Sequence, residues 1–323
     1  MSAAQDGLFS AAQASASGFT KAEIAARVRA GAWHRVVRSV YVERALWAAM
    51  DDRQRHLASA GARLLVLRPG WAVARRSAVL AHDLPYLGKP PQTPQLLRDH
   101  GSGGARVRAT SRHERIAALP QQDVRRLGGL LVSSLERTAL DLARSETFVS
   151  AVVVADAALR RGVEPASLTA VARRCAGWPG GLRALRVAEF ADGLSESPLE
   201  SMSRVAIAAC GLPAPELQIE VWVEQRCVAR VDKLWRGCNL VGEDDGRSKY
   251  VDPGVLYAEK LREEALEDLG LEVVRWDWDA ALRDHRRLEA KIRRGMQQGA
   301  RKVLDPRVRF VPTTVPRVVS RAG

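Results

Sequence analysis

Residues 240–250 read LVGEDDGRSKY, and this stretch decides how the last third of the chain is interpreted. Its apolar start predicts a β-strand, yet three acids follow at the end of that strand: Glu243, Asp244 and Asp245. Because side chains alternate across a strand, Glu243 and Asp245 are expected on one face and Asp244 on the other. Acids this close together repel one another unless a cation or water lies among them. The remainder of the chain has to supply the reason for the cluster.

The composition sets the class of protein and the kind of partner. The chain has 323 residues, of which 46% are hydrophobic, enough for sizeable cores and for two or three domains. Its 50 basic side chains outnumber the 37 acidic ones, and the net charge of +13 favours a polyanion such as DNA as partner. A high-GC genome, which encodes arginine and alanine often, would produce the same excess without any function. No secretory signal and no membrane-spanning apolar run are seen, so we expect a cytoplasmic protein without membrane contact.

Residues 1–48 are expected to form a small helical unit with a β-wing. Thr20 and Glu23 have the spacing of a capping box, which predicts a helix over residues 21–29. The β-rich segment 33–42 then predicts a two-stranded wing, so the order is that of a winged helix-turn-helix. A capping subdomain with solvated arginines is the alternative. The candidate contacts to DNA phosphates are Lys21, Arg27, Arg29, Arg35 and Arg38.

The rest of the chain divides into three further parts. Residues 49–190 predict a mixed α/β middle domain without an arrangement typical of catalysis. Residues 191–300 predict a helix, three strands, a helix and a strand, which indicates a mixed sheet flanked by helices. Residues 301–323 are basic and proline-containing, and are expected to form a flexible tail. The predicted fold class is therefore α/β in these domains and α+β overall.

Acids from separate segments are expected to meet beside this C-terminal sheet. Asp232 ends the strand before the one that carries Glu243, and Glu200 lies near the start of the preceding helix. Several carboxylates at one sheet edge need a counter-charge, which Mg²⁺ or Mn²⁺ provides through oxygen ligands. Such a cation also activates water and stabilises a phosphate under attack, with Lys249 as a supporting charge. A solvated acidic turn is the alternative. The predicted metal ligands are Glu200, Asp232, Glu243 and Asp245, and the predicted catalytic residues are Asp232, Glu243, Asp245 and Lys249.

Three motifs in this region resemble the C-terminal half of the PD-(D/E)XK nuclease superfamily. They are SPLESMSR with Glu200, ARVDKLW with Asp232, and GEDDGRSKY with Glu243, Asp245 and Lys249. The similar branch is that of the very-short-patch-repair endonucleases, whose closing strand resembles residues 271–276. The resemblance implies a restriction-endonuclease-like sheet and Mg²⁺-dependent hydrolysis of DNA.

The front of the chain resembles a second family. The segment GLFSAAQASASGFTKAEIAARVRAGAWHRVVRSVYV is similar to the winged N-terminal domain of AbiEi-type antitoxins, from type IV toxin–antitoxin systems. The segment SSLERTALDLAR is similar to the region next to that domain in many bacterial proteins. This resemblance implies a DNA-binding head, a role in defence or toxin–antitoxin systems, and a cognate toxin or a second copy of the chain as partner.

The sequence departs from the nuclease pattern at three positions. Asp245 stands where the (D/E)-x-K motif has lysine, and Lys249 stands where the similar branch has histidine. Asp244 occupies a usually apolar position, where a buried charge is costly without a partner. Two functions therefore stay open. One is a metal-dependent DNA endonuclease, and the other is a non-catalytic antitoxin-like transcriptional regulator with a degenerate nuclease fold.

Overall fold

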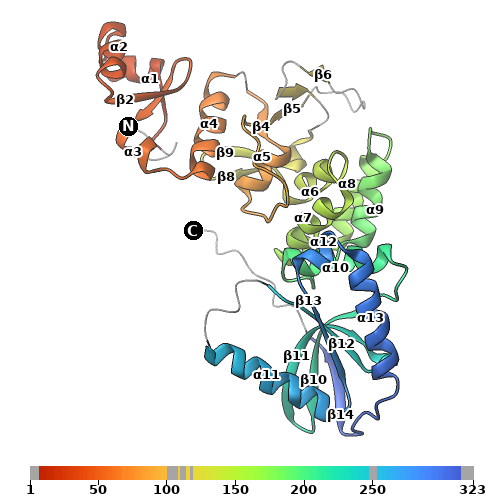
Figure 1. Cartoon of the computed structure of the whole chain (residues 1–323). Coiled ribbons are helices and arrows are strands. Elements are labelled where there is room, and N and C mark those ends of the chain that lie inside the picture. Colours follow the sequence, from red (N-terminus) through yellow and green to blue (C-terminus); the bar gives the residue numbers. More distant parts are fainter. Residues whose placement is uncertain are drawn as a thin grey trace. The chain divides into compact units, whose positions relative to one another are not determined.

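The computed structural model describes residues 7–67, 69–99, 108–109, 114–116, 119–246 and 253–313. The chain divides into two compact units, one made of residues 1–154 and 163–189, the other of residues 155–162 and 190–323 (Figure 1). The described helices and the three antiparallel or mixed sheets make this an α+β fold, as predicted. Within the described ranges, no helix is both long and apolar enough to cross a membrane.

The first unit begins with a three-stranded antiparallel sheet and two short helices. The predicted capping box is present, because the Thr20 backbone N–H donates to Glu23 Oε2 at 2.8 Å and the Glu23 N–H donates to Thr20 Oγ1 at 3.2 Å. Aromatic side chains fill the small core, with Trp33 edge-on to Phe9 and Phe19. The elements are β1 (Phe9–Ser10), α1 (Ala11–Ala16), α2 (Lys21–Arg29), β2 (Trp33–Val37) and β3 (Val40–Glu43).

The first unit continues with a six-stranded mixed sheet in the order β6-β7-β5-β4-β9-β8. Arg137 is buried in this unit and pairs with Asp123 at 3.3 Å and Asp141 at 2.9 Å, so its charge is compensated. The elements are α3 (Arg44–Ala49), α4 (Asp52–Val66), β4 (Trp71–Val73), α5 (Arg75–Ala81), β5 (Leu96–Arg98), β6 (Arg108–Ala109), β7 (Glu114–Ile116), β8 (Val124–Leu127), β9 (Leu130–Ser133), α6 (Leu135–Ala143), α7 (Phe148–Arg160), α8 (Pro165–Arg174) and α9 (Gly181–Phe190). The second half of α7, residues 155–160, and the last residue of α9 belong to the second unit.

The second unit is built on a five-stranded sheet in the order β13-β12-β11-β10-β14. β12 and β13 are parallel, whereas the other neighbours are antiparallel, so the sheet is mixed. The elements are α10 (Pro198–Ala209), β10 (Glu216–Val223), β11 (Arg226–Trp235), β12 (Leu240–Asp244), α11 (Pro253–Asp268), β13 (Glu272–Trp276), α12 (Trp278–Leu282), α13 (His285–Gly299) and β14 (Val308–Pro312).

Helices cover both faces of this sheet. Leu266 of α11 packs in one apolar cluster with Val241 of β12. A side chain at Gly295 of α13 would touch Leu240 and Val274, so α13 lies against the opposite face (Figure 1). The strand β12 is thus enclosed on both sides, which places the acids at its end at the margin of a packed core.

The prediction of a flexible tail over residues 301–323 is wrong for Val308–Pro312, because these residues form β14. This strand pairs antiparallel with β10, from Val308 opposite Val223 to Pro312 opposite Ile219. Val308 and Phe310 pack against the apolar cluster of the sheet, and the pairing satisfies the edge of β10. Partial burial of the alternate side chains Val308 and Phe310 therefore outweighs the basic composition of this segment.

Candidate active site

The sequence placed Asp232 at the end of its strand. In the structure Asp232 lies inside β11, which continues to Trp235. Lys233 is opposite Gly242, so Asp232 is level with Glu243 on the neighbouring strand. The backbone N–H of Asp244 donates to Asp232 Oδ2 at 3.0 Å, which fixes the carboxylate against the end of β12. Asp232 and Glu243 are therefore brought to the same place by strand pairing, although ten residues separate them in the sequence.

Glu200 reaches Asp232 through a residue that the sequence analysis missed, Gln218 of β10. Gln218 Nε2 donates to Glu200 Oε2 at 3.0 Å and lies 3.5 Å from Asp232 Oδ1. Glu200 Oε2 also accepts the backbone N–H of Glu196 at 2.8 Å. Gln218 is 2% exposed and has a φ of 50°, a conformation that is rare for a non-glycine residue and is often found at functional sites. The Gln218 side-chain amide thus links Glu200 of α10 to Asp232 of β11.

Glu243 is the most buried of the predicted acids, with 3% exposure. Burial and the neighbouring Asp232 carboxylate raise its pKa to about 7, and Arg262 opposes this rise. The same two causes, burial and Asp232, raise the pKa of Glu200. Asp232 therefore lies close enough to act on both glutamates. Glu200 and Glu243 each lie near Asp232, and the three acids come from α10, β11 and β12.

Asp245, the fourth predicted ligand, is tied to a basic side chain. Its carboxylate lies 3.7 Å from Arg275 Nη1, and its backbone N–H donates to the Trp276 carbonyl at 2.8 Å. Arg275 in turn contacts Glu259 at 2.6 Å and Glu263 at 2.8 Å. Asp245 thus extends the acid cluster towards a network of ion pairs between β13 and α11.

Asp244 has a partner that the sequence analysis missed. Lys233 pairs with Asp244 inside the sheet, and Trp276 Nε1 donates to the other carboxylate oxygen at 2.7 Å. Lys233 is opposite Gly242 and therefore shares a face with Asp244 two residues on. The spacing of charges on paired strands was the signal that could have found this pair.

Lys249, the predicted catalytic lysine, lies outside the described residues. A different cation contacts the acids, because Arg262 of α11 donates to Glu243 Oε2 at 3.2 Å and to Glu259 Oε1 at 2.8 Å. Arg262 also donates to the Arg230 carbonyl at 3.2 Å, and its side chain is 27% exposed. It is anchored at three acceptors and still meets solvent. Arg262 is one of many charged residues on α11, so the sequence did not indicate that it contacts the acids.

The donor atoms of the cluster fit a hard divalent cation. Glu243 Oε1 and Gln218 Oε1 are buried and have no hydrogen-bond partner within the described part of the chain. Unpartnered buried oxygens are costly, and carboxylate and amide oxygens are the ligands that Mg²⁺ and Mn²⁺ take. Among the same residues, no group of three His, Cys, Asp or Glu side chains is already arranged to hold a metal ion. The residue types therefore suit a divalent cation, but the described acids do not yet form a complete set of metal ligands.

The five basic residues predicted to contact DNA are all exposed on the first unit. Lys21, Arg27 and Arg29 lie on α2, whereas Arg35 lies on β2 and Arg38 in the β2–β3 turn. Arg27 stacks over the rings of Phe19 and Trp33, at 5.0 and 5.4 Å from their centroids. α2 and the hairpin therefore present basic side chains around a rigid aromatic core.

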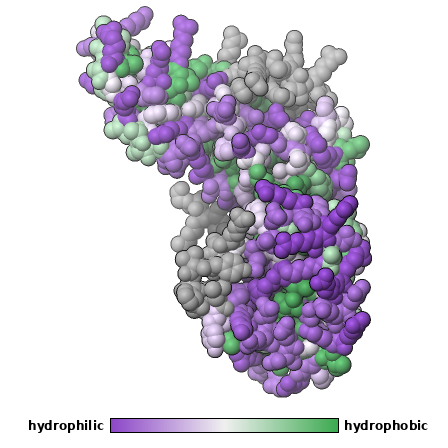
Figure 2. All heavy atoms as spheres, in the orientation of Figure 1, coloured by the Kyte–Doolittle hydropathy of each residue, from purple (hydrophilic) through white to green (hydrophobic). Residues whose placement is uncertain are grey.

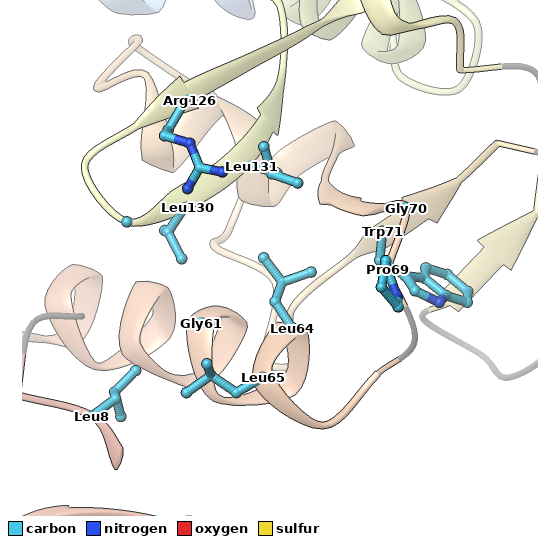
Figure 3. Close-up of a pocket in the computed structure, with 11 residues that line it drawn as sticks. Leu8, Gly61, Leu64, Leu65, Pro69, Gly70, Trp71, Arg126, Leu130 and Leu131 are labelled. Carbon is cyan, nitrogen blue, oxygen red and sulfur yellow. The ribbon is translucent and has the colours of Figure 1, made fainter. Parts of the chain in front are cut away.

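The first unit also contains an apolar pocket of about 310 Å³ (Figure 3). Leu64 and Leu65 of α4, Leu130 and Trp71 are among the side chains that line it. Arg126 supplies the charge among the described lining residues, which include no acid, histidine or nucleophile. Its mainly apolar lining differs from the carboxylates of the acid cluster.

The fold and site define an α+β protein with a buried acid cluster in its C-terminal unit. The chain is 32% identical over 200 residues to "Uncharacterized protein Rv2248" of Mycobacterium tuberculosis strain H37Rv and, equally, to "Uncharacterized protein MT2308" of strain CDC 1551. The match covers 60% of this chain and 72% of each relative. The chain therefore belongs to the same family as these mycobacterial proteins, whose names assign no activity. No family model matches it.

Proposed function

We propose that this protein binds DNA and hydrolyses its phosphodiester backbone with a divalent cation at the acid cluster. The observation that carries the proposal is that Asp232 lies near both Glu200 and Glu243 although the three acids come from separate elements. Gln218 links Glu200 to Asp232, and strand pairing sets Asp232 beside Glu243. Glu200 and Glu243 are buried, and Asp232 is half-buried beside them. Holding such carboxylates close together without a cation is costly, so their arrangement suggests a site that a cation completes. Mg²⁺ or Mn²⁺ is the proposed cofactor, and the bacterial cytoplasm is the proposed compartment.

The chain's own residues have distinct parts in this proposal. When bound, the cation would polarise the phosphate and lower the pKa of water. Gln218 would hold Glu200 and Asp232 at a fixed spacing through its amide. Arg262, anchored beside Glu243 and partly exposed, would neutralise a phosphate oxygen of the substrate, the part otherwise expected of a motif lysine.

Residues 1–48, called the head below, supply the proposed affinity for DNA. Its exposed basic side chains on α2 and the hairpin would contact phosphates, which position a protein on DNA without reading its sequence. The net charge of +13 supports the same partner. A sequence or lesion preference would have to come from other contacts.

The experiment that tests the proposal is plasmid cleavage by the whole chain in Mg²⁺ or Mn²⁺. We expect nicked or linear plasmid with the wild type and with Glu264→Gln, an exposed acid on α11. Asp232→Asn should abolish cleavage. Equal cleavage by Asp232→Asn would trace the activity to a contaminant, and intact plasmid with every metal would contradict the hydrolysis.

A non-catalytic, antitoxin-like transcriptional regulator is the second candidate, favoured by one observation. Arg262 already neutralises Glu243, as a counter-charge would in a site that no longer takes a metal. In that case the second unit would serve for docking to DNA, to a second copy or to a cognate toxin. DNA binding that is indifferent to divalent cations, with no cleavage, would favour this candidate.

A further inference from the structure

A second pocket in the C-terminal unit begins where the acid cluster ends. It encloses about 330 Å³, the lower end of the size range of small-molecule sites. Asp245 forms one wall, Arg275 and Trp276 of β13 another, and Arg287 and Lys291 of α13 a third. Because Asp245 follows Glu243 by two residues, the pocket and the acid cluster are neighbours at one end of the sheet.

The charges of this pocket are unevenly compensated. Arg275 pairs with Asp245, Glu259 and Glu263, and Asp277 accepts the Ala280 N–H at 2.9 Å as the cap of α12. Arg287 acts on Asp277 only through its charge, which helps to lower the pKa of that acid after the larger effect of the Ala280 N–H. Within the described ranges, the Arg287 and Lys291 side chains form no hydrogen bond and no ion pair.

These two cations are spaced to bind one anion between them. They stand four residues apart on α13, so both point to the same side, with their Cβ atoms about 6 Å apart. Both are exposed, and hydrophilic residues dominate the surface over α13 that is visible in Figure 2. An acidic protein segment would meet Asp245 and Asp277 as well, whereas a strand of phosphates presents its charges at intervals and can avoid them.

We infer that this pocket binds one backbone phosphate of DNA through Arg287 and Lys291. This phosphate is the neighbour, on the same strand, of the phosphate that is cut. The inference rests on the proposed action on DNA, and it gives the acid cluster a neighbouring subsite. A phosphate held there fixes the strand where it passes Asp245, so that the next phosphate along lies towards Glu243 and Asp232. Arg287 and Lys291 are thus binding residues that position the substrate.

The test compares two double variants of the whole chain. Arg287→Ala with Lys291→Ala removes the pocket cations, whereas Arg286→Ala with Arg294→Ala removes two exposed charges of the same helix that do not line the pocket. Binding to a short labelled DNA duplex is followed by fluorescence anisotropy in Ca²⁺ at several salt concentrations. We expect the pocket variant to lower the salt-dependence slope by about one, because one phosphate contact is lost, and the control to change it much less. Equal slopes for the two double variants would overturn the inference.

Cleavage separates this inference from the proposed hydrolysis. If wild-type protein cuts plasmid, the pocket variant should raise KM and leave kcat within about threefold, the sign of lost ground-state binding. Wild-type cleavage with an unchanged KM in the pocket variant would refute the subsite and leave the hydrolysis standing. Slopes that differ as expected, with no cleavage by any form, would refute the hydrolysis and leave the phosphate site standing.

Discussion

Lys233 and Asp244 form an ion pair across β11 and β12, with side chains only 0% and 2% exposed to solvent. Trp276 Nε1 donates to the second carboxylate oxygen, so both oxygens of Asp244 have a partner. The backbone N–H of the same Asp244 holds Asp232 in place. The pair therefore fixes the end of β12, where the acid cluster begins.

Removing the lysine alone should destabilise the C-terminal unit. Lys233→Met leaves the Asp244 carboxylate buried without its counter-charge, and we expect a loss of about 3–5 kcal/mol in the free energy of unfolding. The double variant Lys233→Met with Asp244→Leu buries no charge and should lose less than Lys233→Met alone. Urea unfolding followed by far-UV circular dichroism measures both. A loss below about 0.5 kcal/mol in Lys233→Met would show that the pair does not form in solution.

Glu243 should make stability depend on pH in the metal-free protein. Its pKa is 4.5 ordinarily and about 7 in the folded protein, because burial and then Asp232 disfavour the charged form. Between these values the folded state binds one more proton than the unfolded state, so the free energy of unfolding falls as pH rises. We expect Glu243→Gln to remove about 3 kcal/mol of this fall between pH 4.5 and pH 7.

The pH profile of unfolding needs a matched control. Glu264→Gln changes an exposed acid on α11 and should keep the wild-type profile. The comparison with wild type cancels the contributions of other titrating groups, such as Asp156, whose pKa burial raises to about 6. A Glu243→Gln profile parallel to that of the wild type would mean that Glu243 is not buried beside Asp232.

Arg262 should have opposite effects on metal binding and on cleavage. Arg262→Ala removes a positive charge from Glu243 Oε2, so a divalent cation should bind several-fold more tightly. The same change removes the proposed contact to the phosphate, and cleavage should fall by about a hundredfold. Calorimetry and plasmid nicking measure the two effects. Cleavage that rises together with metal affinity would show that Arg262 only blocks the site.

The hairpin arginines should contribute to DNA affinity without setting sequence preference. Arg35→Ala with Arg38→Ala removes two exposed charges from the head, and the salt-dependence slope of DNA binding should fall by about two. Lys89→Ala with Arg173→Ala, two exposed charges elsewhere in the first unit, is the control. Anisotropy with two unrelated duplexes should show the same weakening for both. Equal effects of the two double variants would remove the head from the interface.

Strand alternation and chain order were enough to predict where Asp232 and Glu243 meet. The capping box at Thr20 and the order helix, three strands, helix and strand over residues 198–276 were also predicted, because local spacing determines both. The part of Gln218 in the site was not predicted, because its positive φ arises in the packed sheet and has no signature in the sequence. A partner for Asp244 required the register of β11 against β12, which places Lys233 on the same face.

Long-range pairing explains the other differences. β14 joins the sheet because β10 has a free edge, a fact that depends on residues more than eighty positions away. Arg262 reaches Glu243 only because α11 packs over β11 and β12. Sequence reasoning located the acids and missed the groups that surround them, because those groups come from distant segments.

Calorimetric titration of the whole chain with Mn²⁺ tests the central claim most directly. The account predicts one binding event per chain in the wild type and at least a tenfold loss of affinity in both Asp232→Asn and Glu243→Gln, because each removes a charged oxygen ligand. Glu264→Gln should bind as the wild type does. Identical titrations of wild type, Asp232→Asn and Glu243→Gln would contradict the account, since the converging carboxylates would then hold no cation.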